Sequence, residues 1–85
     1  MENFEYTIKD SVGLHARPAG MLVKKAGEFS SSVTIQKGEK SADAKKIFAL
    51  MGLSIKCGDT IKIEISGEDE KDAAVQLKNF FEENL

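Results

Sequence analysis

A strict alternation of isoleucine with polar residues near the end of the chain constrains the fold more than any other feature. Ile61, Ile63 and Ile65 are separated by a lysine and a glutamate and followed by a serine. This period of two predicts a strand with one buried and one solvated face. Shorter strands are expected at Phe4–Ile8, Val33–Ile35 and Lys40–Ala42. Half-polar strands of this kind favour a mostly antiparallel sheet that leaves one face in water.

Three further segments have apolar residues at helical spacing. The first helix is expected to begin near Pro18 and to end at Gly27, and the second covers Ile47–Met51. The third begins at Asp69, where Asp72 three residues later is close to a capping box. The predicted order is strand, helix, strand, strand, helix, strand, helix. This order favours a two-layer α+β fold, in which the helices stack on the buried face of the sheet.

The size and charge of the chain exclude several functional classes. Eighty-five residues suit one domain, residues 1–85, with 31% charged residues and a net charge of -2. General nucleic-acid or membrane-surface binding is disfavoured, because such proteins usually carry a basic excess. The single cysteine, Cys57, excludes a disulfide framework and a cysteine zinc cluster. With no signal peptide or apolar run of transmembrane length, we expect a soluble, cytoplasmic protein without metal or cofactor.

The only histidine, arginine and proline of the chain lie together in His15-Ala16-Arg17-Pro18, at the expected start of the first helix. A helix start offers free N–H groups and the positive end of the dipole, so Ala16 and Arg17 are candidate phosphate-binding residues. The Arg17 guanidinium can hold phosphate oxygens in a fork. The His15 imidazole, kept neutral by this positive potential, is a nucleophile that can accept a phosphoryl group.

A purely structural role for the same residues is equally compatible with this spacing. His15 would then only cap the helix, and Arg17 would be a solvated cation. The sequence also leaves open whether His15 or Arg17 is the formal N-cap.

The segment Gly13–Ala19, GLHARPA, resembles the active-site signature of the HPr family, the histidine-containing phosphocarriers of the bacterial phosphoenolpyruvate:sugar phosphotransferase system. The similarity extends over all 85 residues. It implies an open-faced β-sandwich, a four-stranded antiparallel sheet covered on one face by three helices. It also implies phosphorylation of His15 on Nδ1, with Arg17 supporting the phosphoryl group. The donor would be enzyme I and the acceptors the IIA domains of sugar permeases, with transcriptional regulators as further candidate partners.

A second family feature is absent from this chain. Family members that are controlled by a serine kinase read Lys-Ser-Ile at the start of the middle helix, whereas this chain reads Lys45-Lys46-Ile47. Lys46 cannot be phosphorylated as a serine is, so kinase control at this position is not expected. Either the lineage lacks the kinase, which we favour, or a cation here suits acidic partner surfaces.

The middle helix has too many large apolar residues for all of them to face inward. Ile47, Phe48 and Met51 are therefore candidate partner-docking residues, by analogy with the apolar patch that the family presents beside its active site. An apolar stripe on a short helix is more often core, so part of this set is expected to be buried.

A phosphocarrier is the function that the sequence favours. The alternative is a paralogous regulatory phosphotransfer or interaction module of the same fold, for example in a nitrogen-linked branch. Retention of His15 argues against the purely regulatory members, in which this residue is replaced. A shuttle must release each partner, so we expect a monomer.

Overall fold

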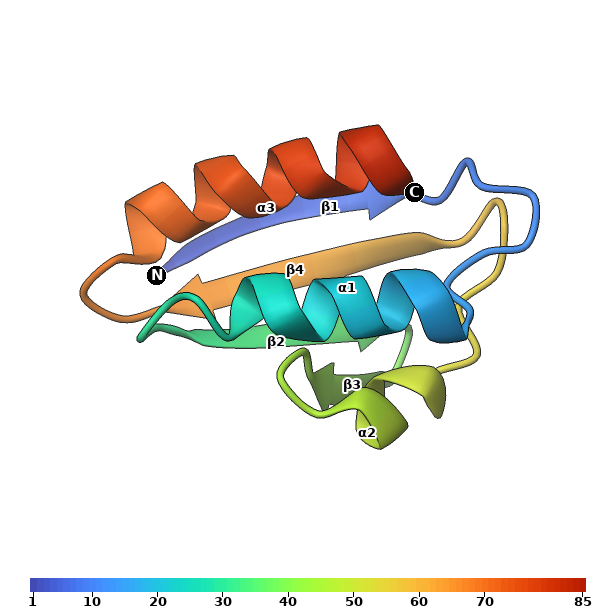
Figure 1. The fold of residues 1–85 in the computed structure, drawn as a ribbon, viewed down its shortest axis with the longest axis horizontal. Coiled ribbons are helices and arrows are strands. Elements are labelled where there is room, and N and C mark those ends of the chain that lie inside the picture. Colours follow the sequence, from blue (N-terminus) through green and yellow to red (C-terminus); the bar gives the residue numbers. More distant parts are fainter.

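The computed structural model describes residues 1–85 as four strands and three helices. The elements follow in the order β1 (Glu2–Thr7), α1 (Ala16–Ala26), β2 (Ser32–Lys37), β3 (Lys40–Asp43), α2 (Ile47–Met51), β4 (Thr60–Ser66) and α3 (Glu70–Asn84). The predicted order and the α+β class are confirmed. Figure 1 shows α3 along β1, α1 beside α3, and α2 against β3.

The sheet has the order β1-β4-β2-β3, and every neighbouring pair is antiparallel. The last strand therefore lies between the first two, and its middle isoleucine has an apolar partner on both sides. Ile63 pairs with Phe4 of β1 and with Ile35 of β2. The polar residues of the same strands face water, so the sheet is open on one side, as the alternation predicts.

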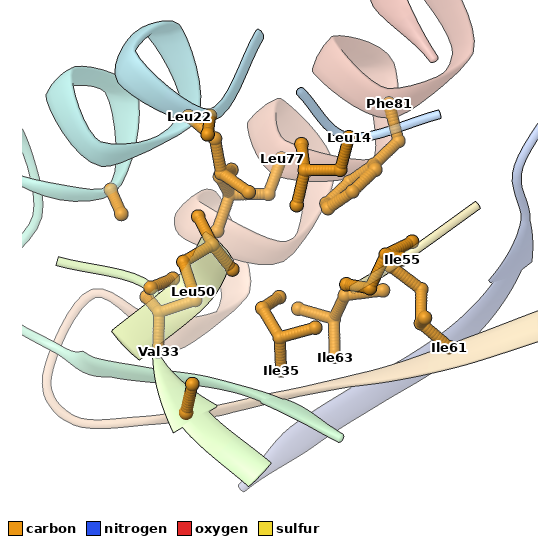
Figure 2. Close-up of a cluster of buried hydrophobic side chains, with 14 of the residues drawn as sticks. Leu14, Leu22, Val33, Ile35, Leu50, Ile55, Ile61, Ile63, Leu77 and Phe81 are labelled. Atoms are coloured by element: carbon orange, nitrogen blue, oxygen red, sulfur yellow. The ribbon is translucent and has the colours of Figure 1, made fainter. Parts of the chain in front are cut away.

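The core lies between the sheet and the helices. Figure 2 shows isoleucines of the sheet pointing toward Leu22 of α1, Leu50 of α2 and Leu77 and Phe81 of α3. Twenty residues form one buried cluster. The Phe81 ring also packs edge-on against Phe4 of β1 at a centroid distance of 6.1 Å, which ties the C-terminal helix to the first strand.

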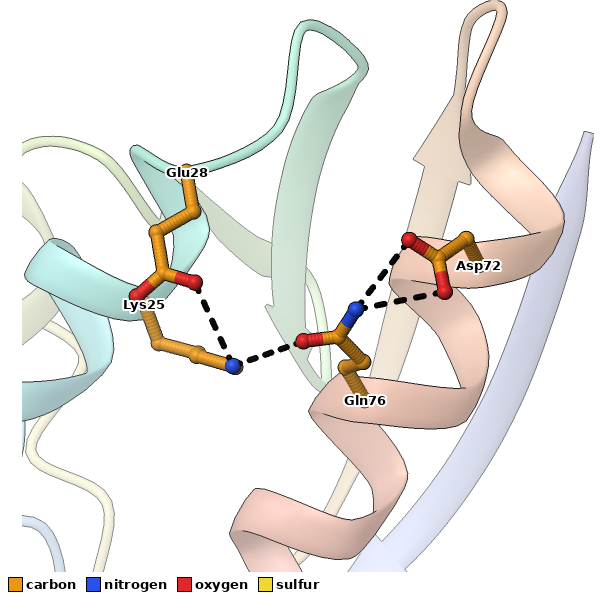
Figure 3. A network of polar contacts seen from close by, with 4 residues as sticks. All are labelled: Lys25, Glu28, Asp72 and Gln76. Atoms are coloured by element: carbon orange, nitrogen blue, oxygen red, sulfur yellow. Dashed lines mark hydrogen bonds and ion pairs between the residues drawn. The ribbon is translucent and has the colours of Figure 1, made fainter.

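A polar network joins the outer surfaces of α1 and α3 (Figure 3). Lys25 Nζ donates to Gln76 Oε1 at 2.7 Å and lies 3.3 Å from Glu28 Oε1. The Gln76 amide in turn donates to both carboxylate oxygens of Asp72. These contacts link the two helices above the core.

The expected capping box at the start of α3 is not present. Asp69 is the N-cap residue, but its side chain makes no capping hydrogen bond within the helix. Its carboxylate instead accepts the backbone N–H groups of Ser30 and Ser31 and the Ser31 hydroxyl. The prediction was wrong because it considered only local partners, whereas the bonds that form reach across 38 residues of sequence.

Candidate functional site

His15 is the N-cap residue of α1, which settles the choice between His15 and Arg17 as the cap. Its backbone is extended, with φ -95° and ψ -172°, and its side chain makes no capping hydrogen bond. The backbone oxygen of His15 accepts the N–H of Ala19 at 2.9 Å, the first bond of the helix. The imidazole is therefore exposed and free of the capping role that a structural histidine would have.

The first turn of α1 leaves two N–H groups free beside this imidazole. Ala16 and Arg17 occupy the first two helical positions, so their N–H groups have no partner inside the helix. Pro18 has no N–H to leave unpaired, and its fixed φ suits the first turn. The free donors and the helix dipole form a site that favours an anion.

His15 and Arg17 line a common cavity of about 310 Å³ together with Asp10, Pro18, Met21 and Asn84. Arg17 is exposed and takes part in no ion pair of the protein. The guanidinium is thus available to a ligand. The cavity unites a nucleophile, an unpaired cation and free backbone donors, which is what acceptance of a phosphoryl group requires.

The loop that leads to His15 is held against two other parts of the chain. Leu14 donates its N–H to the backbone oxygen of Ile55 at 3.0 Å, and its side chain joins the core near Leu77 and Phe81 (Figure 2). Lys9 and Asp10 donate their N–H groups to the backbone oxygen of Leu85, at 2.6 and 2.9 Å. His15 thus follows a residue that is anchored in the core.

Gly13 occupies the tightest position of this loop. Its φ of 79° lies in the left-handed region, and a Cβ there would lie 2.6 Å from the Ile55 backbone oxygen. Only glycine satisfies both conditions without displacing the loop.

The predicted docking residues differ in exposure. Phe48 is 87% exposed and Met51 is 39% exposed, whereas Ile47 is half-buried and packs against the core. A Cβ on Gly20 would lie 3.9 Å from the Cδ1 atom of Ile47, so Ile47 fills the junction between α1 and α2. Lys46 is exposed at the N-cap of α2 and makes no side-chain cap.

The sequence analysis missed three of the residues that line the cavity. Met21 lies four positions after Arg17 on α1, so helical spacing could have found it. Asp10 and Asn84 are brought to the site by the pairing of the loop after β1 with the end of α3. No local pattern signals that contact.

None of the three helices has the length and apolar character that a membrane span needs.

Comparison with known proteins identifies the family. A family model described as "PTS HPr component phosphorylation site" matches residues 2–83. The chain belongs to the HPr family. The phosphocarrier protein HPr of Mycoplasma capricolum is 44% identical over 92% of this chain and 88% of its own length. The crystal structure of HPr-C-His from Thermoanaerobacter tengcongensis has a TM-score of 0.92 at 36% identity, covering 96% of this chain and 92% of the other.

Relatives named HPr-like protein Crh are also similar. The Crh protein of Halalkalibacterium halodurans is 41% identical over 88% of this chain and 89% of its own length. The match to HPr proteins is at least as strong. The chain is an HPr phosphocarrier of the phosphotransferase system, a carrier whose family works with partners such as enzyme I and IIA proteins. The sequence-based prediction of family and function is confirmed.

Proposed function

We propose that His15 accepts the phosphoryl group and that Arg17 and the N–H groups of Ala16 and Arg17 hold it. The observation that carries this assignment is the free imidazole at the helix start, in one cavity with an unpaired guanidinium. The chain has one histidine, so no second imidazole competes for the role. Pro18 lines the same cavity, and its fixed φ restrains the first turn that carries the free donors.

The proposed transfer needs no group from outside the two proteins. The lone pair of one His15 ring nitrogen forms a bond to phosphorus while the bond between phosphorus and the donor breaks. The electron pair of that bond leaves with the donor. The proton on the other ring nitrogen stays, so the product is an imidazolium that carries a dianionic phosphoryl group. The Arg17 guanidinium and the free N–H groups stabilise the added negative charge.

Phe48, Met51 and Met21 form the proposed docking surface beside His15. Their exposed fractions are 87%, 39% and 43%, so these large apolar side chains are accessible to a partner. Methionine side chains adapt to differently shaped partners, as a carrier that meets both a donor and several acceptors requires. Enzyme I would be the donor, IIA domains the acceptors, and transcriptional regulators further partners.

Ile47 contributes to this surface mainly by supporting it, since it packs between α1 and α2. A partner that covers Phe48 must leave again after each transfer. We accordingly expect a monomer, in which no second copy of the chain covers the docking surface. We also expect this single-domain protein to act in the cytoplasm.

Replacement of the histidine tests the proposed role. Wild type and His15→Ala are incubated with phosphoenolpyruvate and enzyme I, and the acid-labile phosphate bound to each is measured. We expect phosphate on wild type only, with the same thermal unfolding midpoint for both proteins, because His15 is exposed. Equal phosphorylation of His15→Ala, or its failure to fold, would show that the histidine has another role.

A further inference from the structure

One acidic side chain lines the cavity around His15, and it takes part in no ion pair. Asp10 lines this cavity with His15 and Arg17. The three ion pairs of the protein all involve other carboxylates, those of Glu28, Asp59 and Glu70. One oxygen of Asp10, Oδ1, accepts the N–H of Val12 at 2.9 Å. The other oxygen receives no hydrogen bond from the protein, so its charge is not offset by a donor.

The position of Asp10 is fixed by its backbone as well as by its side chain. Its N–H donates to the backbone oxygen of Leu85 at 2.9 Å, and its own backbone oxygen accepts the N–H of Gly13 at 3.0 Å. With the bond from Val12, three hydrogen bonds hold this residue at the edge of the cavity. The two backbone bonds fix the place of the residue, and the bond from Val12 restrains the rotation of its carboxylate.

The two charged side chains of the cavity have opposite effects on a bound phosphoryl group. A phosphoryl group carries a charge of about -1.5 to -2 near neutral pH. The guanidinium of Arg17 attracts this group, and the carboxylate of Asp10 repels it. Repulsion by Asp10 raises the free energy of the phosphorylated carrier relative to that of the free carrier.

We propose that Asp10 sets how readily the carrier gives up its phosphoryl group, by weakening the hold of the site on phosphorylated His15. This inference rests on the proposed acceptance of the group at His15. When the group leaves, the bond between phosphorus and the ring nitrogen breaks as a nucleophile of the acceptor protein bonds to phosphorus. The electron pair returns to the ring nitrogen, and the repulsion ends with the departure of the group. Asp10 is thus a positioning and electrostatic residue that favours onward transfer.

Equilibrium exchange between two carriers measures this effect directly. Phosphorylated wild type labelled with ¹⁵N is mixed with an equal amount of unlabelled, unphosphorylated Asp10→Asn and a trace of enzyme I. Mass spectrometry then gives the phosphorylated fraction of each protein. Asparagine keeps the oxygen that accepts the Val12 N–H and removes the charge. We expect the phosphoryl group to accumulate on Asp10→Asn by about three- to tenfold, as for a single charge partly screened by water.

Two further proteins separate charge from geometry. Glu68→Gln makes the same change in net charge at an exposed residue of the loop before α3, outside the cavity, and is expected to share the group equally with wild type. Asp10→Ala removes both the charge and the turn contact and is expected to gain the group as well. High salt should reduce the gain of Asp10→Asn, because exposed charges are screened.

The outcomes distinguish this inference from the function on which it rests. If labelled wild type takes no acid-labile phosphate from enzyme I, the proposed role of His15 fails, and the inference fails with it. If wild type is phosphorylated but shares the group equally with Asp10→Asn, only the inference is overturned. The same conclusion follows if Asp10→Ala gains the group and Asp10→Asn does not, because geometry would then be the cause.

Discussion

His15 makes no side-chain hydrogen bond within its helix, so its place depends on the residues just before it. Leu14 is anchored in the core, and Gly13 allows the chain to turn tightly against the backbone of Ile55. The seven-residue motif thus contains both the chemical groups of the site and the residues that position them. Gly13 therefore belongs to the site because it positions the histidine.

Substitution at Gly13 should therefore affect both stability and phosphoryl transfer. Alanine there must adopt a φ of 79° and place its Cβ 2.6 Å from the Ile55 backbone oxygen. Gly58 is a matched control, since it has a φ of 90° but no atom within 4 Å of the corresponding Cβ. We expect Gly13→Ala to cost about 1–3 kcal/mol more than Gly58→Ala in urea unfolding, because crowding adds to the backbone strain.

Gly13→Ala should also accept phosphate from enzyme I more slowly than Gly58→Ala, because the displaced loop carries His15. Equal stability and equal rates for the two variants would mean that the loop adjusts freely around the added methyl group.

At the scale of single elements, α2 separates its apolar residues between the core and the surface. Leu50 is fully buried, whereas Phe48 on the same short helix is 87% exposed. The sequence predicted that the helix has more apolar residues than the core can take, and the structure identifies which ones remain outside. Spacing alone could not do so, because the exposed side of a five-residue helix depends on how it packs against α1 and β3.

Phe48 should contribute to partner binding and little to stability. We expect Phe48→Ala to raise the KM of enzyme I for this carrier roughly fivefold or more, as for an apolar anchor at an interface. Its unfolding free energy should change by less than about 0.5 kcal/mol, whereas Leu50→Ala should lose about 2–5 kcal/mol. Val75→Ala, at a residue 62% exposed on α3, serves as the control for loss of an exposed apolar side chain. A large stability loss in Phe48→Ala, or an equal KM change in Val75→Ala, would contradict the proposed docking surface.

For the whole molecule, the sequence predicts the elements better than their arrangement. Alternating residues reveal which face of each strand is buried, and so the two-layer fold follows. They do not reveal that β4 lies between β1 and β2, because any of the amphipathic strands could pair on that face. Asp10 and Asn84 illustrate the same limit at the site, since they share a cavity only because the loop after β1 lies against the C-terminal end of α3.

The arrangement also separates the candidate site from a second cluster of polar contacts. The loop that carries His15 lies at one end of the sheet, and the loop between β4 and α3 lies at the other end (Figure 1). At this far end Asp69 accepts hydrogen bonds from Ser30 and Ser31, and Glu70 accepts the N–H of Gly67 and pairs with the Met1 ammonium. We therefore expect these contacts to stabilise the fold without affecting phosphoryl transfer.

Asp69 tests this separation through its pH dependence. The Ser31 hydroxyl and the Ser30 N–H, which donate to its carboxylate, lower the pKa of Asp69 from 3.8 to about 2. A folded-state pKa below that of the unfolded chain stabilises the protein fully above about pH 4, and this contribution is lost as the pH falls toward 2.

We expect Asp69→Asn to unfold at a lower temperature than wild type at pH 7, because a neutral amide is a weaker acceptor for these three bonds. The difference in unfolding midpoint should shrink between pH 4 and pH 2, where wild type loses the charge-assisted bonds. Glu68→Gln, at an adjacent exposed residue that accepts no hydrogen bond, should follow wild type throughout. Acceptance of phosphate from enzyme I at pH 7 and 25 °C should be the same for all three proteins.

A constant difference between Asp69→Asn and wild type at every pH would exclude the carboxylate charge as the cause. A loss of phosphate acceptance in Asp69→Asn while it remains folded would show that the two ends of the molecule are coupled.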